Sequence, residues 1–211
     1  MKIKEAKKII ISLSQPDKMP GYAYGLPAWE CKTGGKLAKV PGSVCFGCYA
    51  MKGNYTRFPA IRESQYKRLA SLKDPRWSEA MAVMINSQAV SKHKFFRWHD
   101  AGDVQDLDHL NKIYSVCRAT PDKRHLMPTR EAWIKEHLKD KPDNLVIRFS
   151  APMMDQLAPD SWPNSSSVIT RDQPWFGATS IICPSSKQGN QCLDCRQCWN
   201  PDIKNISYKA H

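Results

Sequence analysis

Two stretches of the chain place their hydrophobic residues at the spacing of an amphipathic helix. The first follows Asp74-Pro75, a pair that suits a helix N-terminus. Its apolar positions recur at intervals of three and four residues: Trp77, Ala80, Met81, Met84, Ile85 and Ala89. The second carries on one face Leu107, Leu110, Tyr114 and Cys117. We therefore predict a helix in each stretch and a further helix over 59–72, with the apolar faces buried in the core.

Short apolar runs alternate with these helical segments and predict strands. They cover residues 9–13, 95–98, 125–129, 144–149, 168–170 and 179–182, and a short helix is expected around 132–138. About six strands alternating with helices favour a mainly parallel α/β sheet or an incomplete (β/α) barrel. A chain of 211 residues with 41% hydrophobic content supports one core, so we predict a single α/β domain over residues 1–211.

The chain is strongly basic, with 32 Lys and Arg against 20 Asp and Glu and a net charge of +12. That balance disfavours acidic function classes and makes nucleic acid or a small anionic ligand the expected partner. The apolar patch near the N-terminus is far shorter than a signal peptide, and no apolar run approaches the ~18 residues of a membrane span. We therefore expect a cytoplasmic protein without a membrane partner.

The strongest chemical signal lies near the end of the sequence. Four of the eight cysteines form a C-x8-C-x2-C-x2-C array: Cys183, Cys192, Cys195 and Cys198. Gaps of two residues let successive thiolates face one centre, as in iron–sulfur proteins, whereas zinc sites more often use two separated pairs. Clustered thiols in a reducing compartment also more often hold metal than form disulfides. The array predicts a metal-binding segment at 183–199, with a [4Fe-4S] cluster preferred and zinc as the alternative.

Three more cysteines, Cys31, Cys45 and Cys48, lie in an irregular segment rich in glycine and proline. Such long segments inside a compact domain are often functional. We predict a second metal-binding segment at 25–50, where three thiolates can hold a cluster and leave one iron open. The alternative is a single metal that draws ligands from both ends of the chain. Cys117, on an apolar helix face, is expected to be a small buried hydrophobic residue.

The C-terminal ends of the predicted strands carry four arginines: Arg97, Arg130, Arg148 and Arg171. In a parallel barrel these ends meet at one rim, where guanidinium groups can bind a phosphate or a carboxylate through paired hydrogen bonds. We predict an anion-binding site there, with His99 and Asp100 at its edge as candidate catalytic residues. The alternative is that each arginine faces solvent or pairs with a nearby carboxylate, and that His99 only braces the core.

Three motifs together carry a family resemblance: PGSVCFGCYA at 41–50, FRWHDAGD at 96–103, and Cys192-x2-Cys195-x2-Cys198-Trp199. With a match over roughly residues 25–200, the chain resembles the phage gene product eighty-eight family. The resemblance implies a distant relation to radical S-adenosylmethionine enzymes. The fold of those enzymes is a partial (β/α) barrel with a [4Fe-4S] cluster in the loop after the first strand. The resemblance to a phage family also implies an infected host cell as the location.

The cysteine spacing departs from that enzyme pattern. The radical enzymes carry a compact Cys-x3-Cys-x2-Cys, whereas this chain has Cys31-x13-Cys45-x2-Cys48, which bears on whether S-adenosylmethionine binds. The sequence also lacks a nucleophile elbow, a Walker motif and G-x-G-x-x-G, so those hydrolase and nucleotide-binding classes are set aside.

Two functions follow from the sequence. The first is an iron–sulfur protein with redox or radical chemistry on an anionic or nucleic-acid-linked substrate. The second is a non-catalytic protein, stapled by zinc or iron–sulfur, whose basic surface binds nucleic acid or a host protein. The kind of metal bound distinguishes the two.

Overall fold

The computed structural model describes residues 1–171 and 180–210, and these form a sheet of seven parallel strands. The strands are β1 (Tyr22–Tyr24), β2 (Phe95–Trp98), β3 (Arg124–Thr129), β4 (Leu145–Ser150), β5 (Ser165–Ile169), β6 (Ser180–Ile182) and β7 (Asn205–Lys209). Their spatial order is β1-β2-β3-β4-β5-β7-β6, and within the described residues the sheet does not close. The α/β class and the parallel strands are confirmed, with one strand more than the six expected.

The prediction of a strand at 9–13 is wrong, because helix α1 (Ile3–Ile10) ends at the second residue of that segment and no strand begins in the rest of it. Its buried residues, Ala6, Ile9 and Ile10, lie at helical spacing and pack against α5 (Trp77–Ile85). The first strand is β1 instead. Thr179, the first residue of the last predicted strand, lies outside the described residues.

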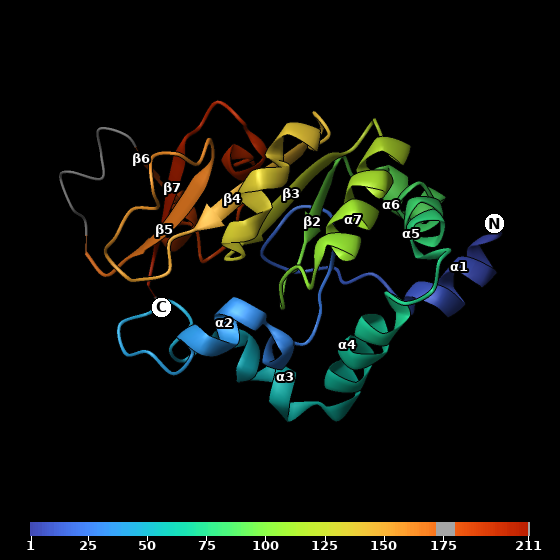
Figure 1. Ribbon diagram of the computed structural model, residues 1–211, viewed down its shortest axis with the longest axis horizontal. Helices are drawn as coiled ribbons and strands as arrows, with labels where there is room; N and C mark the ends of the chain where they lie inside the picture. Colours follow the sequence, from blue (N-terminus) through green and yellow to red (C-terminus); the bar gives the residue numbers. More distant parts are fainter. Residues whose placement is uncertain (172–179, 211) are drawn as a thin grey trace.

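Helices cover one face of the sheet. They include α5, α6 (Gln88–Ser91), α7 (Leu107–Ala119) and the 3-10 helix η3 (Ala132–Asp140), whereas α4 (Pro59–Ser71) lies below the strands beside α3 (Asn54–Arg57). Strands β1 to β5 follow the order of the sequence, so right-handed crossovers keep their connections on the same side. Figure 1 shows α5, α6 and α7 gathered there. The predicted apolar stripes are buried in this layer except for Ala89 and Leu107, which are exposed, and Cys117 is fully buried as expected.

The opposite face is covered by the chain between β6 and β7. This segment, residues 183–204, is called the cysteine tail and contains η4 (Pro184–Lys187) and η5 (Gln197–Trp199). Its Trp199 is buried beside Leu126 and Val146, and its indole Nε1 donates a 3.1 Å hydrogen bond to the carbonyl oxygen of Phe96 in β2. The tail therefore forms a second, smaller core on this face.

The segment after β1 runs along the C-terminal edge of the sheet. We call residues 25–58 the cysteine loop; it contains η1 (Ala28–Glu30), α2 (Lys32–Leu37), η2 (Tyr49–Met51) and α3 (Asn54–Arg57). Figure 1 shows α2 and α3 below the strands. In the described part of the chain, no helix is long and apolar enough to span a membrane.

Candidate functional site

The cysteine loop is fastened to the ends of three neighbouring strands. After β2, the carbonyl oxygen of Ala101 accepts a 2.8 Å hydrogen bond from the backbone N–H of Leu26. After β3, the buried carboxylate of Glu131 accepts two hydrogen bonds of 2.9 Å, from the backbone N–H and the hydroxyl of Thr33. After β4, Pro152 accepts a 2.9 Å hydrogen bond from Val44. The loop is thus held over the C-terminal edge of the sheet.

These attachments bring Cys31, Cys45 and Cys48 together. A tight turn closes the short gap, because the N–H of Cys48 donates a 3.0 Å hydrogen bond to the carbonyl oxygen of Cys45 and Gly47 adopts a φ of 82°. Cys31 approaches from the start of α2. A Cβ atom on Gly34 would lie 3.5 Å from the sulfur of Cys45 and 3.7 Å from that of Cys31. The missing side chain of Gly34 therefore leaves space beside both sulfurs.

The three thiols lie in a poorly solvated and partly charged environment. Burial raises the pKa of Cys31 far above that of a free thiol, and the carboxylate of Asp103 and the other two sulfurs raise it further. Burial also raises the pKa of Cys45, but the Arg130 guanidinium, which hydrogen-bonds its sulfur, opposes that rise. Three half-buried thiolates side by side would need positive charge, and Arg130 supplies only part of it.

Asp103 sets the position of Arg130. Its carboxylate accepts hydrogen bonds from the backbone N–H of Arg130 at 2.9 Å and from the hydroxyl of Thr129 at 2.7 Å. Burial raises the pKa of Asp103 to about 6, and the nearby Glu131 adds to the rise, although these hydrogen bonds oppose it. Nε of Arg130 is buried without a hydrogen-bond partner. It is an unused donor next to the three-cysteine site.

The tail gathers the other four cysteines into a second group. The N–H of Cys195 donates a 2.8 Å hydrogen bond to the carbonyl oxygen of Cys192, repeating the turn found between Cys45 and Cys48. Burial raises the pKa of Cys192 to about 11, and the neighbouring sulfurs of Cys198, Cys183 and Cys195 contribute to that rise. The array that the sequence grouped by spacing is therefore also grouped in space.

Arg148 holds the tail rather than an anion. Its guanidinium lies on the tail face of β4 and is 1% exposed. All its N–H groups are directed at backbone carbonyl oxygens, those of Ser165, Gln197, Cys198, Asn200 and Ile203, at 2.8 to 3.3 Å. No donor remains for a ligand, so we leave Arg148 out of the proposed site.

Arg97 lies between the two cysteine groups. It projects from β2 towards the tail face, where it acts electrostatically on Cys198 and Tyr208, and it also acts on Tyr49 of the cysteine loop and on Asp100. Nε of Arg97 is buried without a partner, and so is one carboxylate oxygen of Asp100. This cationic side chain therefore links the surroundings of both groups.

The remaining predicted site residues lie elsewhere. Arg171 follows β5 and is exposed, so the four strand-end arginines do not converge on one point. His99 is 3% exposed, has a φ of 60°, and packs edge to face against the ring of His109 at 5.4 Å. Neither ring nitrogen of His99 has a partner, and burial lowers its pKa well below the usual value.

Two surface hollows lie away from the three-cysteine site. One, of about 620 Å³, is bordered by Ile3 of α1, Ala82 of α5 and Ser115 of α7. The other, of about 550 Å³, is lined by His93 and Arg196 among others. Neither is lined by a cysteine, so neither is the basis of our functional interpretation.

Sequence reasoning did not identify Gly34, Glu131 or Tyr208 as site residues. The hydroxyl of Tyr208 lies 3.1 Å from the sulfur of Cys198. A signal for it was present, since Ile206 and Tyr208 alternate with polar residues as in a half-buried strand. Glu131 and Gly34 carry no such signal, because their roles depend on contacts between the loop and β3.

Comparison with known proteins identifies the family but no function. No curated protein and no solved structure matches the chain. The family model described as Gene product 88 matches residues 2–201, nearly the whole sequence. The resemblance that three motifs predicted is thereby confirmed at the level of the family: the chain belongs to the Gene product 88 family.

Proposed function

We propose that the protein is an iron–sulfur protein with two [4Fe-4S] clusters and that it carries out redox or radical chemistry. One cluster is assigned to Cys31, Cys45 and Cys48, and the other to Cys183, Cys192, Cys195 and Cys198. The observation that carries this proposal is the separation of seven cysteines into a group of three and a group of four, whose members act electrostatically on each other.

The C-x2-C-x2-C spacing in the sequence favours a cluster over a single zinc ion. Four thiolates around one zinc, at Zn–S distances of about 2.3 Å, lie within about 4 Å of each other. Thiolates around a cluster bind separate irons and stand further apart. The space beside Gly34 adjoins the sulfurs of Cys31 and Cys45, where such a group would lie.

The two groups suit different roles. Four cysteines close the coordination of a cluster, which suits electron transfer. Three cysteines would hold a cluster with one iron free of protein ligands, which would supply a site for binding and reducing a small molecule. Arg130 lies beside Cys45, and Arg97 lies near Tyr49 of the cysteine loop. Each has a buried Nε without a partner, so both suit an anionic substrate group.

The family resemblance adds S-adenosylmethionine as a ligand for the three-cysteine site. The consecutive strands β1 to β5, with the cysteines directly after β1, support the relation to radical enzymes. The open sheet and the long Cys31-x13-Cys45 gap set this chain apart from their usual pattern.

Anaerobic purification tests the proposal. We expect a brown protein with broad absorbance near 400 nm, about eight irons and eight sulfides per chain for two cubane clusters, and a paramagnetic signal after reduction. Added S-adenosylmethionine should change the signal of one cluster only. A colourless protein that contains stoichiometric zinc would overturn the proposal and leave the non-catalytic, metal-stapled protein in its place.

A further inference from the structure

The outer surface of the cysteine loop carries an unusual group of exposed rings. Three aromatic side chains rank among the large hydrophobic residues most open to solvent in the described structure: Phe46 at 52%, Tyr49 at 62% and Phe58 at 49%. Phe46 and Tyr49 flank the ligand candidates Cys45 and Cys48 in sequence. Exposed rings at a site of proposed chemistry need a function other than packing.

Positive charge is concentrated on the same surface. Between residues 28 and 62 the chain has one acidic residue, Glu30, against six basic ones, Lys32, Lys36, Lys39, Lys52, Arg57 and Arg62. All six are exposed, and within the described residues none forms a salt bridge. The hydroxyl of Tyr66 donates a 3.0 Å hydrogen bond to Glu30. This segment therefore contributes +5 of the net charge of +12.

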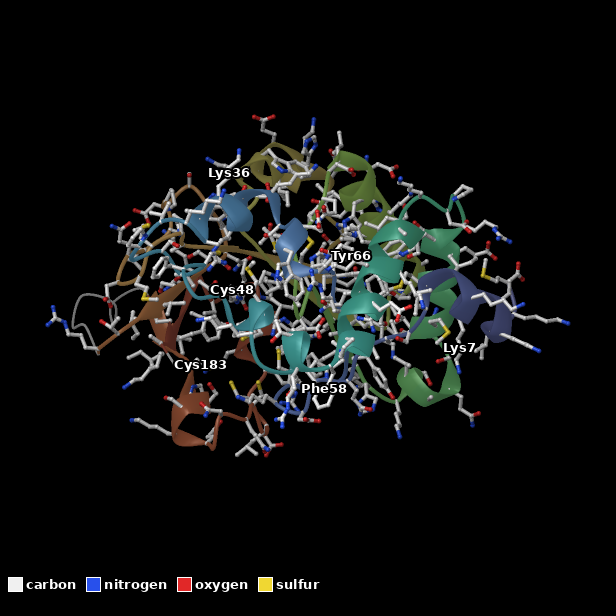
Figure 2. The ribbon with its side chains drawn as sticks, turned by 90° about the horizontal axis from the view of Figure 1, so that it is seen from below. Lys7, Lys36, Cys48, Phe58, Tyr66 and Cys183 are labelled. Atoms are coloured by element: carbon white, nitrogen blue, oxygen red, sulfur yellow. The ribbon has the colours of Figure 1, made fainter. Side chains whose placement is uncertain are left out.

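The two arginines of this segment, Arg57 and Arg62, each lie over aromatic rings. The guanidinium of Arg62 lies 4.6 Å from the ring centre of Trp29 and 5.9 Å from that of Tyr66, and Arg57 lies 5.9 Å from the ring of Phe58. Figure 2 shows Lys7 on the opposite side of the molecule from Lys36 and Cys48, with Phe58 and Tyr66 between them. Cations and rings are thus interleaved around the three-cysteine site.

We propose that this surface binds single-stranded nucleic acid. The basic side chains contact phosphates, and unpaired bases stack on Phe46, Tyr49 and Phe58. Separated rings between cations suit a strand of stacked bases better than they suit a continuous protein interface. A base stacked on Phe46 or Tyr49 would lie next to the three-cysteine site, so the bound strand would be the substrate of the proposed chemistry. That assignment as substrate rests on the proposed function, whereas the binding itself does not.

Oligonucleotide binding by the full-length protein tests this inference. Fluorescence anisotropy compares a labelled 20-nucleotide DNA strand, the RNA of the same sequence, and the DNA duplex, each over a range of salt concentrations. We expect both single strands to bind more tightly than the duplex. Phe58→Ala should weaken binding about 5- to 100-fold. Lys36→Glu should weaken it and make the salt dependence shallower by about 0.7 in slope for each phosphate that is no longer neutralised.

Lys7→Glu on α1 is the matched control, since it makes the same charge change at the far end of the molecule. An equal loss of affinity in Lys7→Glu and Lys36→Glu would overturn the inference, because net charge alone would then govern binding. The absence of binding to any strand at 50 mM salt would also overturn the inference. Full competition by anionic lipid vesicles, together with unchanged affinity in Phe58→Ala, would overturn it as well. Iron content is measured for every variant: an iron-free protein that still binds strands defeats the proposed function alone.

Discussion

Nε of Arg148 donates a 2.9 Å hydrogen bond to the carbonyl oxygen of Cys198, which ties the middle of β4 to the last cysteine of the tail. We expect Arg148→Lys to lower the free energy of unfolding by about 2–4 kcal/mol, because three lysine donors cannot replace the guanidinium network. Urea unfolding and limited proteolysis of residues 183–204 measure the effect. Arg171→Lys, at an exposed position, should change stability by no more than about 0.5 kcal/mol.

Two adjacent glycines of α2 allow a sharp test of the three-cysteine site. In Gly34→Ala the new methyl group would lie 3.1 Å from Cβ of Cys31 and close to two sulfurs, whereas a Cβ on Gly35 has no atom within 4 Å. We expect Gly34→Ala to lose about half the iron and Gly35→Ala to keep all of it. Both changes raise helix propensity equally, so backbone effects cancel. Equal iron contents in the two variants would contradict the proposed site.

Cysteine replacements test whether the two groups are independent. Cys45→Ser and Cys195→Ser should each remove about half the iron and sulfide, and the double variant should remove nearly all, because each change affects only one ligand set. Cys117→Ala should leave metal content unchanged and cost about 1 kcal/mol of stability. Full iron content in Cys195→Ser would argue against the four-cysteine site.

The pH dependence of stability should reveal the buried histidines. Burial lowers the pKa of His109 and that of His125 to about 3, with smaller contributions from Lys112 and Lys123 respectively. Both pKa values are about 6.5 in the unfolded chain, so the unfolded state binds more protons between about pH 3 and pH 6.5. Stability is therefore fully present above that range and is lost as the pH falls, by about 1.4 kcal/mol per pH unit for each proton.

His109→Gln checks that sign. Its difference in unfolding free energy from the native sequence should be constant above pH 7 and should change steadily below pH 6.5, because one titrating group is gone. Urea titrations at half-unit steps of pH measure it. Parallel curves down to pH 4 would show that His109 is not held neutral in the folded protein.

Periodicity predicted the helices and most strands, but it failed where apolar runs are short. The run Ile9-Ile10-Ile11 suggested a strand, although Ala6 and Ile9 already gave the helical spacing of α1. β1 has only three residues within a segment rich in proline and glycine, so no alternation could show. Boundaries set by tertiary contacts lie beyond local pattern.

The candidate site divides in the same way. The C-x2-C gaps were enough to predict that Cys45 lies near Cys48 and that Cys192 lies near Cys195, whereas the place of Cys31 beside Cys45 depends on the fold of the loop. The role of Arg148 was not predictable, because its partner carbonyls lie up to 55 positions away and are fixed by how the tail packs on β4. Arg130 likewise needed the loop attachment through Glu131 before it could be placed beside Cys45.

Because β7 lies between β5 and β6 in the sheet, the order in which parts of the sheet can form during synthesis of the chain is fixed. β6 pairs only with β7, so it has no neighbour in the sheet until residues 205–209 have left the ribosome. The cysteine loop, in contrast, needs only strands β1 to β4, which are made earlier. A nascent chain can therefore complete its first cysteine group while β5 still presents an unpaired edge, and β7 closes that edge later.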